Sequence, residues 1–323
     1  MSHHSSSGSY LVIRHKPEKG VLLPRNVKDP DPLDKHPRAE KSDAWPAVFL
    51  GTAQLSRRYG VGSDHGRPNS LQTAVQLVRY AERNGFGGLD TASIYGRAEA
   101  DIGLSGSTLP VFTKLAPNMS WLESLQQSKQ RLKREFLDCV FIHEALTLDS
   151  EQTKTIQLLH SRKGDDIGAI GASIYEIDEF HRANENPNID VIQLPYSVLD
   201  RRFSQDFLQE FLRPGKQVFA RSVLLQGFLT SSPGEPRVAD QHLSAWVSAF
   251  QSTARDGGAT PLAAALAFVR ANQSLAGFVV GTSSRRELWE ISSTFQSPFP
   301  PSVIEELGTL ECPPWNLVDP RKW

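Results

Sequence analysis

Cysteine is scarce in this sequence. Only two occur among 323 residues, Cys139 and Cys312, and they lie far apart in the chain. Two cysteines cannot build a disulfide scaffold or a cysteine-rich zinc site, and no Cys-x-x-Cys spacing is present. The scarcity is typical of a reducing compartment, so we expect a cytoplasmic protein without a metal centre.

An excess of charge of one sign is also missing. Lys and Arg number 35, Asp and Glu number 36, and the formal net charge is -1. A protein that binds mainly phosphate backbones needs a basic face, so this balance argues against nucleic acid as a partner. No apolar run approaches the roughly 20 residues of a membrane helix, and the first residues are too polar for a signal peptide.

Three regions of the chain differ in composition. Residues 1–45 are rich in Pro, Lys, Asp and His without periodicity, which predicts an extended, disordered N-terminal extension. Residues 46–295 carry regular apolar patterns typical of a globular core. Residues 296–323 are rich in Pro and contain Trp315 and Trp323. We expect a tail packed on the outside of the globular part, with a position near its mouth as the alternative.

Short apolar runs between residues 46 and 295 predict eight strands separated by helical spacing. The expected strands cover residues 48–52, 87–91, 110–114, 138–143, 168–173, 190–194, 217–222 and 277–281. Strands that alternate with helices pair in parallel through right-handed crossovers. Eight such units in about 250 residues favour a closed (β/α)8 TIM barrel. The alternative, an open doubly wound sheet, needs a glycine-rich turn after its first strand, and none is present.

Four polar residues follow the ends of three consecutive predicted strands. Asp90 ends the second strand and Tyr95 follows it, while Lys114 ends the third and His143 the fourth. In a (β/α)8 barrel the active site lies at these ends, so the four side chains should converge. A lysine ammonium brings the pKa of a nearby tyrosine down, and an aspartate supplies the counter-ion that a buried lysine needs. Such a tyrosine can give a proton to a carbonyl oxygen as hydride arrives, with the histidine orienting the carbonyl.

Each of these residues also has a purely structural interpretation. Asp90 could cap a helix, Tyr95 could be a surface aromatic, Lys114 a solvated strand end and His143 a core histidine. Their common position at strand ends favours the chemical interpretation. Lys114 could also form a Schiff base with a carbonyl substrate, as in barrel aldolases.

A series of short motifs resembles the aldo-keto reductase family. The motifs are FLGTAQ, LDTASIYG, FTK, FIHE, IGASIY, IQLPYSVLDRR, ARSVLLQGFLT and VVGTSSRRELWE, and together they span roughly residues 47–295. Some of these runs are most similar to a bacterial branch found among sugar and surface-polysaccharide enzymes. The resemblance implies an NAD(P)H-dependent oxidoreductase that interconverts an aldehyde or ketone, sugar-derived ones included, and an alcohol. Its catalytic residues would be Asp90, Tyr95, Lys114 and His143.

The resemblance also implies residues that hold the nicotinamide end of the cofactor. Gly51 and Thr52 correspond to backbone beside the nicotinamide, and Gln193 to a glutamine that binds the carboxamide. Ser173 matches the serine of a serine–asparagine pair, but Ile174 replaces the asparagine.

The segment after the seventh strand matches the family's pyrophosphate loop at Ser222 and Leu224. Arg221 stands where many members stack a tyrosine on the nicotinamide. A guanidinium can also stack, and its charge could instead bind an acidic substrate or a phosphate. Together with residues 57–59, Arg221 is consistent with an anionic or polyhydroxylated substrate.

The last motif bears on cofactor preference. In this motif Gly281, Thr282 and Ser283 connect the end of the eighth predicted strand to the start of a helix. A helix N-terminus is a natural site for a phosphate. Arg285 and Arg286 follow, and either could pair with the 2′-phosphate of NADP. We therefore expect these residues in the cofactor site, and the resemblance favours NADP(H) over NAD(H).

Two residues of the same motif depart from the family pattern. Glu287 stands where many members have glutamine, and Ile291 replaces an asparagine that usually touches the adenine. A carboxylate near the ribose would accept the 2′-hydroxyl of NAD and repel a 2′-phosphate. Glu287 is therefore also a candidate cofactor residue.

The alternative function is a redox-sensing regulatory barrel, like the potassium-channel beta subunits of this family.

Overall fold

The structure is a computed structural model that describes residues 46–56, 69–117, 119–143, 147–231, 240–295 and 297–322. The expected N-terminal extension, residues 1–45, and the segment 57–59 lie outside the described residues. Every helix in the described part of the chain is too short or too polar to cross a membrane.

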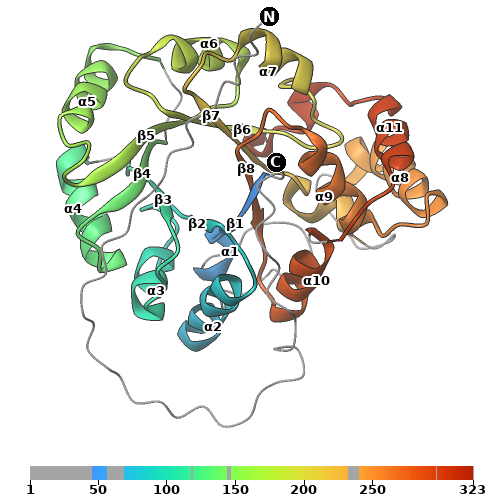
Figure 1. Ribbon diagram of the computed structural model, residues 1–323, viewed down its shortest axis with the longest axis horizontal. Helices are drawn as coiled ribbons and strands as arrows, with labels where there is room; N and C mark the ends of the chain where they lie inside the picture. The colour runs from blue at the N-terminus through green and yellow to red at the C-terminus, as the bar shows by residue number, and fades with distance from the viewer. Residues whose placement is uncertain are drawn as a thin grey trace, which may run out of the picture. The chain divides into compact units, whose positions relative to one another are not determined.

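The described strands number eight, and they pair in parallel in chain order to form a closed barrel, with β1 joined to β8 (Figure 1). They are β1 Ala47–Gly51, β2 Gly88–Asp90, β3 Val111–Lys114, β4 Leu137–Ile142, β5 Ile167–Ser173, β6 Val191–Pro195, β7 Gln217–Arg221 and β8 Gly277–Gly281. Each lies within one residue of the predicted strand at either end. The predicted (β/α)8 barrel is therefore confirmed, and the open sheet is not formed.

The helices surround the strands, as Figure 1 shows. They are α1 Ala53–Ser56, α2 Leu71–Arg83, α3 Ala98–Ser105, α4 Trp121–Leu132, α5 Ser150–His160, α6 Ile177–Glu185, α7 Gln205–Phe211, α8 Asp240–Asp256, α9 Pro261–Ala271, α10 Arg285–Phe295 and α11 Pro301–Thr309, with 3-10 turns η3 Leu225–Thr230, η4 Trp315–Leu317 and η5 Pro320–Lys322. N-cap hydrogen bonds explain where two of the helices begin. The hydroxyls of Ser70 and Ser120 accept hydrogen bonds from backbone N–H groups in the first turns of α2 and α4.

The C-terminal segment contains one helix that the sequence analysis did not predict. Helix α11 begins with proline at its first position, where the missing N–H costs nothing. It packs against α8 and α9 on the outside of the barrel, with Val303 and Leu307 buried.

A plug of aromatic rings fills the barrel interior. Its largest side chains are Phe49, Phe112, Phe141 and Phe219, and all of them are buried. In the neighbouring strands Gly88 stands beside Phe49 and Gly277 beside Phe219, and a Cβ on either glycine would collide with the ring. Because side chains occupy this part of the barrel, a ligand must bind above it, at the carboxyl ends of the strands.

Candidate active site

Strand periodicity places the candidate side chains in one layer above the plug. Inward-facing residues recur every second position along a barrel strand. Lys114 follows the plug residue Phe112 by two positions, and Arg221 follows Phe219 in the same way. Gln193 follows Val191, which also belongs to this interior cluster. Side chains far apart in the sequence are thereby brought to one mouth.

The centre of this layer is a buried ion pair. The Lys114 Nζ donates to Asp90 Oδ1 at 2.7 Å, to Asp90 Oδ2 at 2.8 Å and to the Thr91 carbonyl at 3.0 Å. Gln193 Nε2 also donates to Asp90 Oδ2, at 2.7 Å. Lys114 is only 2% exposed and Asp90 5%. A buried charge pair is tolerated when hydrogen bonds complete its geometry, and here several converge on one carboxylate.

Burial dominates the proton affinity of Lys114. Removal from water lowers the pKa of its ammonium, and the carboxylate of Asp90 opposes this by favouring the charged form. The cation of Arg221 adds a smaller lowering effect. This amine donates to three oxygens and does not line the cavity described below. The arrangement suits a fixed cation and disfavours the Schiff-base alternative.

Tyr95 and His143 lie beside this ion pair. Tyr95 is in the segment after β2, where the hydroxyl of Ser56 donates to its carbonyl at 2.5 Å. The Lys114 Nζ is 5.6 Å from the centroid of the Tyr95 ring. His143 follows β4 directly, and its ring centroid is 6.0 Å from that of Tyr95 with the planes at 80°. The structure thus brings all four predicted catalytic residues together.

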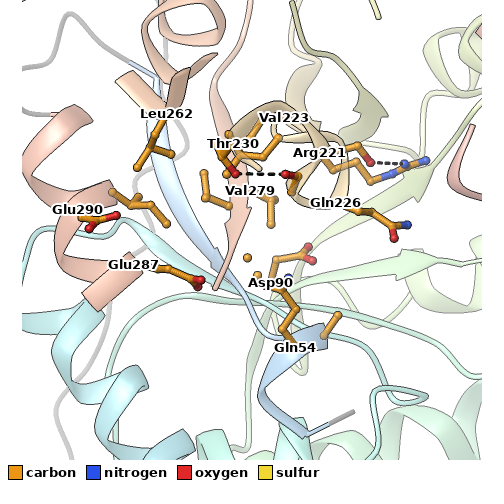
Figure 2. Close-up of a pocket in the computed structure, with 18 of the residues that line it drawn as sticks. Gln54, Asp90, Arg221, Val223, Gln226, Thr230, Leu262, Val279, Glu287 and Glu290 are labelled. Atoms are coloured by element: carbon orange, nitrogen blue, oxygen red, sulfur yellow. Dashed lines mark hydrogen bonds between the residues drawn. The ribbon is translucent and has the colours of Figure 1, made fainter. Parts of the chain in front are cut away.

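A cavity of about 730 Å³ opens beside Asp90 and Tyr95. Its wall runs from Asp90 and Tyr95 to helix α10, and includes Gly51, Thr52, Gln193, Arg221, Ser222, Leu224, Gly281 and Glu287 from the predicted set. In Figure 2, Arg221 and Gln226 lie on one side of the cavity and Glu287 and Glu290 on the other, with Val279 between them. Other members of the predicted set do not line it: Lys114, His143, Ser173, Thr282, Ser283, Arg285 and Arg286.

Two features of the cavity suit a bound amide or nucleotide. Gln193 is fully buried, and its Oε1 has no hydrogen-bond partner among the described residues, which leaves an acceptor for a ligand donor. Gly51 and Gly281 expose bare backbone to the cavity; a Cβ on Gly51 would come within 3.0 Å of the Val279 side chain, and one on Gly281 within 2.6 Å of the Gln54 amide. The side chains of Val279 and Gln54 therefore require glycine at these two positions, and the two glycines line the cavity with main-chain atoms alone.

The segment after β7 has an unusual backbone. The backbone φ angles of Ser222, Leu225 and Gln226 are 57°, 45° and 53°. Residues other than glycine rarely adopt such values. Strained backbone of this kind concentrates at functional sites. Ser222 and Gln226 line the cavity, as do Gly227 and Thr230. The sequence analysis assigned Ser222 and Leu224 here but missed Gln226, Gly227 and Thr230.

Comparison with known proteins agrees with this geometry. The sequence model of the aldo/keto reductase family matches residues 47–311. The chain belongs to the aldo/keto reductase family. It is therefore an oxidoreductase that acts on carbonyl or alcohol groups of small molecules with a nicotinamide cofactor. No curated protein sequence matches the chain significantly.

Solved structures of aldo-keto reductases share the fold. AKR11C1 from Bacillus halodurans, in its holo form, superimposes with a TM-score of 0.67 at 19% identity, over 82% of this chain and 93% of that one. PA4992 from Pseudomonas aeruginosa, provisionally described as an aldo-keto reductase, gives 0.57 at 20% identity, over 82% and 95%. At this identity the likeness concerns the fold.

At the far end of the cavity, this aldo/keto reductase carries acidic side chains. Glu287 and Glu290 both belong to α10 and line the cavity, as does Trp289. The sequence analysis missed Trp289 and Glu290. Arg286 pairs with Glu290 at 3.0 Å, and the Arg285 guanidinium lies 5.5 Å from the Tyr80 ring centroid. Neither arginine lines the cavity.

The C-terminal tail of the reductase reaches the rim of the site. The guanidinium of Arg221 lies 3.8 Å from the centroid of the Tyr175 ring, and that of Arg321 lies 3.9 Å from it. Arg321 also donates to Glu176 at 2.7 Å and to Asp319 at 2.6 Å. Arg221 is further tied to the Ile174 carbonyl at 2.7 Å. One aromatic ring therefore connects the tail to a side chain of the cavity wall.

Proposed function

We propose that this enzyme reduces carbonyl compounds with Tyr95 as general acid and Lys114, Asp90 and His143 as its supporting residues. One observation carries the proposal. Lys114 is bound to both oxygens of Asp90 and lies 5.6 Å from the Tyr95 ring at the edge of the cavity. A fixed cation beside a phenol favours the phenolate, which makes the phenol a better proton donor.

In this mechanism the carbonyl oxygen lies near the Tyr95 hydroxyl. The tyrosine donates its proton as negative charge develops on that oxygen, and the Lys114 ammonium stabilises the phenolate that remains. Asp90 holds the ammonium in place, because an unpaired lysine at this depth would be costly. His143, next to the tyrosine, hydrogen-bonds the carbonyl and fixes its direction. The nicotinamide cofactor, when bound, supplies the hydride.

The cavity wall offers groups for a nicotinamide dinucleotide. Gln193 would accept from the carboxamide through its unpartnered Oε1, beside bare backbone at Gly51 and Gly281. The strained segment with Ser222 and Leu224 would follow the pyrophosphate. A cavity of about 730 Å³ falls within the range of cofactor sites. The family resemblance favours NADP(H), through Arg285 and Arg286, whereas Glu287 favours NAD(H).

For the substrate, the resemblance of the motifs to sugar-associated enzymes favours a sugar-derived aldehyde or ketone. Arg221 on the cavity wall would suit a carboxylate or several hydroxyl groups on such a molecule. A panel of aldoses, uronates, keto acids and simple aldehydes therefore tests the substrate class directly.

The deciding experiment measures cofactor oxidation over this panel for the wild type, Tyr95→Phe and Tyr196→Phe. Tyr95→Phe should stay folded and bind cofactor, while reduction falls about 10²–10⁴-fold, the usual contribution of a general acid. Tyr196→Phe is the matched control: this buried phenol stacks on Phe268 and does not line the cavity, so activity should persist. Near-normal reduction by Tyr95→Phe would refute the mechanism. Tight cofactor binding by the wild type without turnover on any substrate would favour the redox-sensing alternative.

A further inference from the structure

A buried carboxylate outside the cavity wall contacts the strand that carries Lys114. Glu99 lies in the first turn of α3, is 1% exposed and is not among the residues that line the cavity. Side chains alternate along β3, so Thr113, the residue before the inward-facing Lys114, faces the surrounding helices. There the Thr113 hydroxyl donates to Glu99 Oε1 at 2.7 Å. The carboxylate is therefore attached to the strand of the buried cation.

The other oxygen of Glu99 reaches the segment of Tyr95 through Arg131 of α4. Arg131 Nη1 donates to Glu99 Oε2 at 3.4 Å and to the Ser93 carbonyl at 3.3 Å. Ser93 in turn donates to the Lys114 carbonyl, from its N–H at 3.1 Å and from its hydroxyl at 2.9 Å. Tyr95 follows Ser93 by two residues. One carboxylate thus joins the strand of the ammonium to the segment of the phenol.

We propose that Glu99 is a positioning residue for the reaction: through Thr113 and Arg131 it fixes the separation between the Lys114 ammonium and the Tyr95 phenol. The inference rests on the proposed function, in which this cation makes the phenol a better proton donor. The Lys114 Nζ is 5.6 Å from the ring centroid. Coulomb attraction falls with distance, so a phenol that moves away from the cation holds its proton more tightly.

Glu99→Gln tests this with little change of shape. A carboxylate accepts at both oxygens, whereas an amide offers one acceptor and one donor group, so the bond to either Thr113 or Arg131 is lost. Alcohol oxidation, which uses the phenolate as base, should then rise at a pH higher by roughly 0.3–0.8 unit, the Coulomb effect of a drift of about 1–3 Å. For reduction, kcat should fall about 10–10²-fold, the cost of misplacing a catalytic group by about 1 Å. KM should change by less than about twofold, because Glu99 does not line the cavity.

A second measurement follows the phenol without turnover. The tyrosinate absorbance of each protein is titrated with pH, and the titration of its Tyr95→Phe counterpart is subtracted, which isolates one phenol. The isolated transition should move to higher pH in Glu99→Gln.

Arg131→Met keeps the proposal testable where Glu99→Gln does not fold. It retains the length of a partly exposed side chain and removes the donors to Glu99 and Ser93. It should move both pH profiles in the same direction as Glu99→Gln. The double variant should add little, because the two residues act through the same bonds.

Asp138→Asn is the matched control, because Asp138 forms a similar buried pair at the opposite end of the same strand. Asp138 is 1% exposed and lies 3.5 Å from Arg134. It accepts from the N–H of Val111, the first residue of β3, at 2.8 Å. The substitution should lower the unfolding temperature about as much as Glu99→Gln does, and it should leave both pH profiles in place.

Unchanged pH profiles in folded Glu99→Gln and Arg131→Met would overturn the proposal. An equal displacement in Asp138→Asn would do the same, because Glu99 would then contribute only to general stability. Failure of the proposed function gives a different result: Tyr95→Phe then remains active, whereas failure of this inference alone leaves Tyr95→Phe inactive.

Discussion

The two ends of the cavity are built in different ways. At the strand end, Asp90, Lys114 and Gln193 come from three strands and interlock through hydrogen bonds of 2.7–2.8 Å. At the helix end, Glu287 bonds within its own turn, to Thr282 and Ser283. A change at the strand end disturbs several elements at once, whereas the helix end can change residue by residue. We therefore expect the strand end to determine the reaction and the helix end to determine the cofactor.

The largest effect should come from Lys114→Met, which tests the strand end. The change leaves the carboxylate of Asp90 buried with one donor side chain fewer, and breaking a buried ion pair costs about 3–5 kcal/mol of stability. Turnover should fall by about 10²–10⁴-fold, because the phenol loses its neighbouring cation. Thermal unfolding and kcat are measured together. Lys114→Arg, which keeps the charge, serves as the control, and a folded Lys114→Met variant with ordinary turnover would contradict the assignment.

The pH dependence of reduction tests the same residue in the wild type. Burial lowers the pKa of Lys114, so its ammonium loses the proton below the ordinary value of 10.5. Reduction needs the cation and the phenolic proton, and kcat should therefore fall as pH rises, beginning below pH 10.5. The reverse oxidation uses the phenolate as base, so its rate should rise with pH. In Lys114→Met that rise should move to higher pH. An oxidation profile that is unchanged in Lys114→Met would show that Lys114 does not tune the phenol.

A smaller effect is expected from Gln193→Met, which tests whether the two ends are linked through the cofactor. The variant removes a hydrogen bond to the Asp90 carboxylate, worth about 1.5–3 kcal/mol, and the acceptor proposed for the carboxamide. The dissociation constants of NADH and NADPH should both rise about tenfold, with their ratio unchanged. Asn184→Leu is the control, since this buried amide bonds Phe211 and Arg213 outside the cavity. A change in the ratio would show that Gln193 also discriminates between the cofactors.

Sequence patterns predicted the strand end better than the helix end for a physical reason. Apolar runs define the barrel strands, and the barrel fixes which residues meet at the mouth, so Asp90 and Lys114 could be placed from their positions alone, whereas Gln193 was assigned through the family resemblance. The partner of a long polar side chain depends on local geometry. Two contacts at the helix end illustrate this dependence. Arg285 lies near the Tyr80 ring, and the Glu287 carboxylate accepts a hydrogen bond from Thr282 in the turn before its own helix. The Ser-x-x-Glu spacing at the start of α10 was a usable signal for that contact.

Two other features were missed for similar reasons. The sequence analysis predicted a proline-rich packed tail and named no helix in it, although proline at the first position is compatible with helix α11. The positive φ values around Leu225 and Gln226 have no composition signal, since neither residue is glycine or asparagine.

The smallest effect should come from the tail, which approaches the cavity from the rim between β5 and β7. Arg321→Ala removes a guanidinium from one face of Tyr175, a contact worth about 0.5–2 kcal/mol, together with partly exposed bonds to Glu176 and Asp319. The ring then loses support opposite Arg221, so the side chain of Arg221 on the cavity wall becomes less fixed. We expect KM for the carbonyl substrate to rise by a few fold, with kcat nearly unchanged, because the ion pair of Lys114 is untouched. Lys322→Ala is the matched control: it removes a cation from Trp315, which stacks with Arg202 and not with Tyr175. Equal effects of the two variants would show that the tail acts only through general stability, and a loss of kcat in Arg321→Ala alone would place the tail in contact with the reacting groups.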